Sequence, residues 1–191
     1  MKYLAALALL TCCAYLPSLA GQPVYEDTNI LPALSQPFAW DQVLQPRSVI
    51  LLSYRLTGAD PFIGHLFSVS VHLVNGLLLW LWASALVGDL SLLIVAIFWL
   101  HPLQTESVAY LTGRGELLAC LGLLTTLVAL TRLSGGLRAF LVAFAGLFAL
   151  GAKEASVVGL LIGLACYTGQ WPAWFLWNGL ALSFADKLPH T

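Results

Sequence analysis

A long run from Pro61 to Val87 contains no Asp, Glu, Lys or Arg, and this run limits the folds that the chain can adopt. A helix rises about 1.5 Å per residue, so a run of this length can cross the roughly 30 Å hydrocarbon core of a bilayer with some tilt. Gly88-Asp89 reads as a tight turn that ends the run. We therefore expect a transmembrane helix over 61–87.

The composition extends this expectation to the whole chain. Hydrophobic residues make up 60% of the sequence and charged residues only 9%, which is too little polar surface to cover a soluble globule of 191 residues. Membrane lipids are therefore the expected surroundings. The formal net charge of -1 provides no broad basic field, so nucleic acid is not an expected partner.

Further apolar runs follow the same logic and predict an all-α, polytopic integral membrane protein with about seven transmembrane helices in a single membrane domain, 1–191. Proline in His101-Pro102 is expected to break the third run. The N-terminal run, 1–20, has the shape of either a first transmembrane helix or a signal peptide, and we favour the retained helix. The seven runs are 3–19, 61–87, 90–100, 117–130, 137–150, 155–168 and 171–184.

Residues 21–60 form the one substantial loop outside the membrane in this scheme, followed by a helical bundle over 61–191. Within the loop, the apolar residues 49–52 and Tyr54 lie beside Arg47 and Arg55. This pattern predicts a short amphipathic helix in the headgroup zone.

Basic residues in short loops indicate the orientation. An N-terminus in the cytoplasm places Lys2, Arg132 and Arg138 on the cytoplasmic side. The periplasmic or lumenal side then receives Arg47, Arg55, Arg114 and Lys153, which departs from the positive-inside expectation. Either the orientation is reversed, or these outer cations bind an anion near the membrane surface.

The predicted topology brings three clusters of acidic and basic residues to one face of the membrane. Carboxylates serve as bases or metal ligands, and arginine or lysine can hold a lipid phosphate, so the clusters suit group transfer from a phospholipid-like donor. Ordinary solvated loop charges remain the alternative. The clusters are Glu26 with Asp27; His101, Glu106, Arg114 and Glu116; and Lys153 with Glu154.

The residues of the second cluster could lie on one helix. If one helix begins at Thr105, Glu106 lies in its first turn, where the helix dipole favours an anion. Tyr110 and Gly113 would then share the face of Glu106, and Arg114 would lie about 80° round the axis. In that position Arg114 would either neutralise Glu106 or reach an incoming phosphate.

A polar stripe runs along the otherwise apolar helix at 61–87. His65, Ser68, His72 and Asn75 follow i, i+3, i+7, i+10 spacing and so face one side. Hydrogen bonding to a neighbouring helix is the favoured role, with a metal-binding or catalytic role as the alternative. The four cysteines lie in apolar runs without CxxC spacing, so the sequence predicts no metal site from them.

Several of these residues carry a family resemblance. The stretch HPLQTESVAYLTGRGELLA (101–119) resembles the most distinctive segment of the C-type (GT-C) multi-pass glycosyltransferases, nearest to the membrane part of the TPR-bearing protein O-mannosyltransferases. Weaker agreement extends over most of the chain, from about Pro23 to Cys166. It includes Tyr25-Glu26-Asp27, Arg47 before Leu51-Leu52-Ser53-Tyr54, Asp60-Pro61-Phe62 with His65, His72 and Asn75, and Lys153-Glu154.

The resemblance implies a sugar on a polyprenyl phosphate as donor and a hydroxyl group of a protein or glycan as acceptor, on the outer face. It implies Asp27 or Glu26 as the base, Glu106 as a further candidate catalytic residue, and Arg114, Lys153 and Arg47 as ligands of the donor phosphate. His101 and Glu154 would be loop residues of the same site. Whether a divalent metal takes part is left open.

The sequence also departs from the family. The usual Asp-Asp pair is Glu-Asp here, and about seven helices with no TPR array indicate a truncated relative of the N-terminal part of the family. Two functions follow: a sugar transferase, or a non-catalytic accessory subunit that keeps the helical fold and packs against other membrane protein subunits. The sequence leaves open whether this chain is itself an enzyme.

Overall fold

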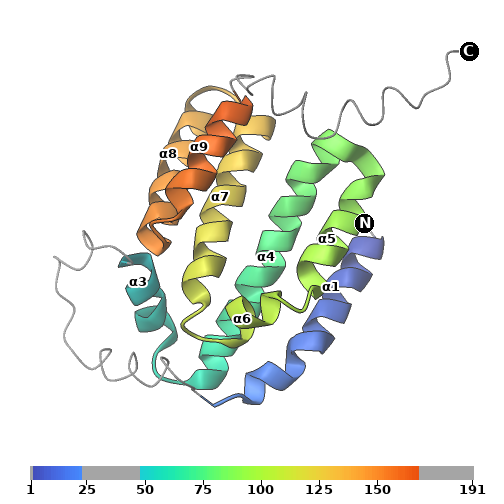
Figure 1. Ribbon diagram of the computed structural model, residues 1–191, viewed down its shortest axis with the longest axis vertical. Coiled ribbons are helices and arrows are strands. Elements are labelled where there is room, and N and C mark those ends of the chain that lie inside the picture. Colours follow the sequence, from blue (N-terminus) through green and yellow to red (C-terminus); the bar gives the residue numbers. More distant parts are fainter. Residues whose placement is uncertain (1, 23–47, 168–191) are drawn as a thin grey trace, which may run out of the picture.

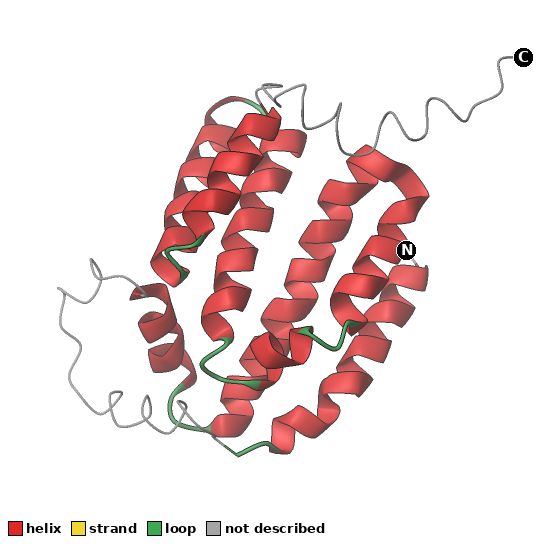
Figure 2. Cartoon of the chain, in the orientation of Figure 1, coloured by secondary structure: helices red, strands yellow, loops and turns green. Residues whose placement is uncertain are grey.

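The computed structural model describes residues 2–22 and 48–167, and these ranges are helical nearly throughout (Figure 1). No strand occurs within them (Figure 2), which confirms the all-α expectation for this part of the chain. The elements are α1 (Lys2–Tyr15), η1 (Leu16–Ala20), α3 (Ser48–Thr57), α4 (Pro61–Val87), η3 (Gly88–Leu90), α5 (Ser91–Leu100), α6 (Gln104–Ala109), α7 (Arg114–Arg132), α8 (Gly135–Ala152) and α9 (Ser156–Tyr167).

Four helical stretches in the described ranges are long and apolar enough to cross a membrane: Lys2–Ala20, Pro61–Leu100, Arg114–Arg132 and Gly135–Ala152. The expected count of seven is not confirmed. α5 has 10 residues and rises only about 15 Å at about 1.5 Å per residue, and the described part of α9 has 12 residues. The run expected at 171–184 lies outside the described residues.

The longest helix, α4, has the bounds expected from its uncharged sequence, and local chemistry sets both of its ends. The Asp60 carboxylate caps the first turn by accepting a 2.9 Å hydrogen bond from the Phe62 amide. Pro61 occupies the first helical turn, where its missing amide hydrogen costs nothing. Gly88 ends the helix with a φ of 56°, a left-handed value that favours glycine.

α5 folds back against α4 after this turn, so residues 61–100 form a helical hairpin (Figure 1). The contact centres on Trp99, which is fully buried. Its indole Nε1 donates to the His72 carbonyl at 3.1 Å, and the ring lies where a Cβ on Gly76 would be. Glycine at position 76 therefore lets the two helices approach.

α7 and α8 form a second, antiparallel hairpin that is packed through small residues. A Cβ on Gly122 would lie 2.6 Å from the Ala145 carbonyl oxygen and 2.9 Å from the Ala149 amide nitrogen. Because these side chains are so small, the two backbones touch. Such packing is common between membrane helices, which gain little from apolar burial against each other.

Hydrogen bonds at both ends of α7 fix its direction relative to α4. Near its C-terminus, Arg132 donates to the Leu81 carbonyl at 2.7 Å. Near its N-terminus, Arg114 donates to the Gly64 carbonyl at 3.1 Å. The two helices therefore run parallel. We call the end of the bundle that holds α6 and the first turns of α4 and α7 the α6 end, and the opposite end the η3 end.

The short helix expected around residues 49–55 is present as α3, against α4, α7 and α8. Two glycines allow its approach: a Cβ on Gly115 would lie 2.7 Å from Ile50 Cδ1, and one on Gly151 would lie 2.9 Å from Val49 Cγ2. The other face of α3 is apolar and exposed, as at Leu56. Its location in the headgroup zone stays a prediction.

Candidate functional site

The connection from α5 to α7 carries most of the distinctive sequence stretch, and it begins with a helix break at His101. Pro102 disfavours helical backbone at the residue before it, and His101 is extended, with φ −67° and ψ 130°. The His101 ring then accepts a 3.2 Å hydrogen bond from the Leu103 amide. The chain becomes helical again at Gln104, the first residue of α6, so Glu106 lies on a short helix at the α6 end.

The continuous helix from Thr105 through Arg114 is a wrong expectation. α6 ends at Ala109, because Tyr110 is extended, with φ −91° and ψ 131°. The chain then turns so tightly that a Cβ on Gly113 would lie 2.6 Å from the Glu106 carbonyl oxygen. Glu106 and Arg114 therefore lie on two different helices, α6 and α7, and the expected angle of about 80° between them does not apply.

Arg114 is fully buried at the first turn of α7. Its Nη1 donates to the Thr57 hydroxyl at 3.0 Å, and its Nη2 donates to the Gly64 carbonyl at 3.1 Å. The guanidinium carbon also lies 4.6 Å from the centre of the Tyr54 ring and 5.0 Å from that of Phe67, which are cation–π distances. Arg114 thereby joins α3, α4 and α7.

Tyr54 closes this arrangement from the α3 side. Its hydroxyl donates a 2.6 Å hydrogen bond to the Leu111 carbonyl, so the ring that faces Arg114 is itself held by the α6–α7 connection. Sequence reasoning missed Tyr54, Thr57 and Phe67 as partners of Arg114. Their spacing gave one usable signal, since Tyr54 and Thr57 are i, i+3 neighbours on one helix face.

Lys153 lies at the end of α8 and forms an ion pair with Glu116 in the first turn of α7. The side chains are 38% and 49% exposed, so water screens this pair. A carboxylate at the N-terminal turn of a helix is also favoured by the helix dipole. The structure therefore brings Lys153 to the α6 end, with Glu116 as its counterion.

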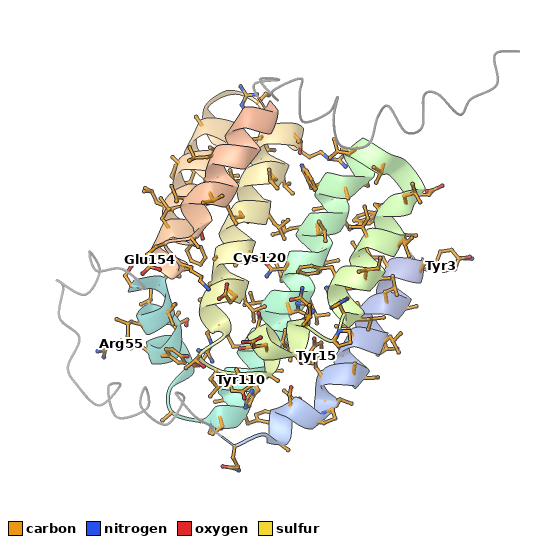
Figure 3. The ribbon with its side chains drawn as sticks, viewed as in Figure 1. Tyr3, Tyr15, Arg55, Tyr110, Cys120 and Glu154 are labelled. Carbon is orange, nitrogen blue, oxygen red and sulfur yellow. The ribbon has the colours of Figure 1, made fainter. Side chains whose placement is uncertain are left out.

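The remaining predicted residues are exposed charged or polar residues, residues outside the described ranges, and the polar stripe of α4. His101, Glu106 and Glu154 are exposed. Figure 3 labels Glu154 where α8 meets α9, above Arg55 of α3, and Tyr110 farther down, by the first turns of α4. No group of three or more His, Cys, Asp or Glu residues suited to a metal ion occurs within residues 2–22 and 48–167. Glu26, Asp27 and Arg47 lie outside the described residues.

The polar stripe of α4 faces the interior of the bundle. His72 Nε2 lies 3.3 Å from the Trp99 carbonyl oxygen, and Asn75 Nδ2 donates to the Leu117 carbonyl at 2.9 Å. The His72 ring also contacts the Tyr15 ring of α1 edge-on, with 5.5 Å between centroids. The stripe thus bonds α4 to α5 and α7, as polar groups in membrane helices usually do.

A partly open hollow of about 230 Å³ lies between α7 and α9, away from the acidic and basic residues. Its wall is apolar, with Cys120 and Gly159 among the lining residues. The Thr126 hydroxyl in the wall is already bonded to the Gly122 carbonyl at 2.9 Å. The Thr126 hydrogen is therefore not free to bond a phosphate oxygen.

The fold and the charged residues at its α6 end define the class, a membrane protein built of apolar helices with an acid- and base-bearing end. The chain is similar to protein O-mannosyl-transferase TMTC1 of Mus musculus, with 30% identity over 144 aligned positions. The match covers 61% of this chain but only 15% of the mouse protein, so the similarity is distant and partial. No family model matches the chain, and no solved structure matches it.

Proposed function

We propose that the chain is a GT-C-like membrane protein that transfers a sugar, mannose by similarity, from a polyprenyl phosphate to a hydroxyl acceptor on the periplasmic or lumenal side. The observation that carries the proposal is the similarity to an O-mannosyl-transferase in a chain of apolar helices. The presence of Glu106, Glu116, Lys153 and Glu154 at one end of the bundle supports it.

The proposed reaction is a single inverting displacement. Asp27, or its neighbour Glu26, takes the proton from the acceptor hydroxyl as its oxygen attacks the anomeric carbon. The bond from that carbon to the phosphate oxygen breaks, and polyprenyl phosphate leaves with the electron pair. The cations Lys153 and Arg47 would stabilise the phosphate, and Glu106 would assist in the same site. Arg114, expected from the sequence as a third phosphate ligand, is fully buried and would instead hold α3, α4 and α7 together beside the site.

A second candidate is a non-catalytic accessory subunit that packs against other membrane proteins. It is favoured by the surroundings of the two described cations, because Arg114 is enclosed by protein groups and Lys153 is paired with Glu116. In such a subunit these cations would hold helices together. A transferase needs Lys153 to exchange Glu116 for a phosphate.

A sugar-transfer assay separates the two. The full chain in lipid nanodiscs would receive radiolabelled polyprenyl-phosphate mannose and a serine- and threonine-containing peptide, with and without a metal chelator. We expect transfer by the parent chain and a loss of about 10²-fold or more in Asp27→Asn, because the base is removed. Asp89→Asn, an equivalent change at the η3 end, is the matched control and should keep full activity.

Two outcomes count against the transferase proposal. Unchanged transfer in Asp27→Asn removes Asp27 as the base. No transfer by the parent chain, alone or with added membrane extract, contradicts the proposal and favours the accessory subunit.

A further inference from the structure

The polar stripe of α4 contains polar atoms that form no hydrogen bond to a neighbouring helix. Ser68, His72 and Asn75 are each fully buried. Within the described ranges, three of their atoms have no hydrogen-bond partner: Ser68 Oγ, His72 Nδ1 and Asn75 Oδ1. Leaving a buried polar group without a hydrogen bond is costly and rare in folded proteins, so three such atoms on one helix face require an explanation.

The hydrogen bond at Nε2 of His72 determines whether Nδ1 donates or accepts a hydrogen bond. The Trp99 carbonyl oxygen can only accept, so the 3.3 Å contact places a hydrogen on Nε2, and in a neutral imidazole the other nitrogen then carries none. Nδ1 is then an acceptor. Asn75 donates through Nδ2 to the Leu117 carbonyl, which leaves Oδ1 as a second acceptor. Ser68 contributes a hydroxyl that both donates and accepts.

The spacing of these groups suits water. Ser68, His72 and Asn75 are i, i+4, i+7 residues, so the Cβ atoms of successive residues lie about 5–6 Å apart on one face of the helix. A water oxygen that makes two hydrogen bonds bridges a similar distance. One water can donate to His72 Nδ1 and Asn75 Oδ1, and a second can join it to Ser68 Oγ.

We propose that Ser68, His72 and Asn75 form an internal water-binding site in the middle of the bundle, enclosed by α1, α4, α5 and α7. The site holds a short file of ordered water, as buried polar groups commonly do. Water fits better than a metal cation, because no group of three or more His, Cys, Asp or Glu in the described ranges is suited to a metal. The proposal does not depend on sugar transfer.

The first test uses the sign of a stability change. In the full chain in nanodiscs, Ser68→Ala should lower the thermal unfolding midpoint by about 2–4 °C, because a bound water loses a partner. If the Ser68 hydroxyl had no hydrogen-bond partner at all, Ser68→Ala would instead raise the midpoint, because it would remove an unbonded buried polar group.

Ser70→Ala is the control on the exposed face of α4, where the hydroxyl bonds to the Leu66 carbonyl at 2.7 Å. A midpoint for Ser68→Ala equal to or above that of Ser70→Ala overturns the proposal.

A second measurement does not depend on variant stability. Solid-state NMR of ¹⁵N-histidine-labelled chain can detect polarisation transferred from water protons to each ring nitrogen. We expect transfer to His72 Nδ1, assigned by its loss in His72→Gln, and a weaker signal in Asn75→Leu. The exposed His101 ring supplies the positive reference. A dry His72 beside a hydrated His101 also overturns the proposal.

Discussion

At the scale of single residues, the structure changes the meaning of Arg114. The sequence presents it as a cation in a polar loop, ready for a phosphate. In the structure it is enclosed by groups from three helices, with two hydrogen bonds and two aromatic rings around its guanidinium. Lysine cannot replace this arginine, because only the planar guanidinium donates hydrogen bonds in two directions and also stacks on aromatic rings.

We therefore predict that Arg114→Lys destabilises the protein by about 1–3 kcal/mol, because lysine cannot serve Thr57 and Gly64 together. Thermal unfolding in nanodiscs measures the change. Arg138→Lys on α8 is the control and should alter stability by less than about 0.5 kcal/mol. Equal stability of Arg114→Lys and the parent would show that the buried contacts contribute little.

At the scale of elements, the apolar runs predicted most helices well. The run without charged residues predicted both ends of α4 correctly, and His101-Pro102 predicted the end of α5. The error at Tyr110 has a physical cause: nothing in the local pattern forbids a helix from Thr105 through Arg114. The break depends on the tight contact of Gly113 with α6. Likewise, the partners of Arg114 come from segments about 50 residues away, which no periodicity reveals.

Packing between elements gives the next prediction. Gly76→Ala should destabilise the α4–α5 hairpin by about 1–3 kcal/mol, because the new Cβ overlaps the Trp99 indole. Gly146→Ala on α8 is a matched control, since its Cβ would meet Leu160 at an ordinary 3.6 Å. The control should be neutral or gain up to about 1 kcal/mol from helix propensity. The two variants are compared by thermal unfolding, and an equal effect would contradict the close contact.

At the scale of the whole molecule, the bundle has two chemically different ends. The α6 end carries His101, Glu106, Arg114, Lys153 and Glu154, whereas the η3 end carries Asp89 and Arg132. The sequence predicted this separation from the order of apolar runs, although the count of seven spans is not confirmed. Which end faces the lumen or periplasm stays a prediction, and the proposed chemistry depends on it.

Site-directed labelling shows which end of the bundle faces the lumen or periplasm. The four cysteines would be replaced by alanine, and single cysteines introduced as Glu106→Cys, Glu154→Cys or Asp89→Cys, all at exposed positions. In sealed vesicles, a membrane-impermeant maleimide should label the first two from the periplasmic or lumenal side and Asp89→Cys from the cytoplasmic side. Labelling of Glu106→Cys and Asp89→Cys from the same side, or of Glu106→Cys only from the cytoplasm, would contradict the account.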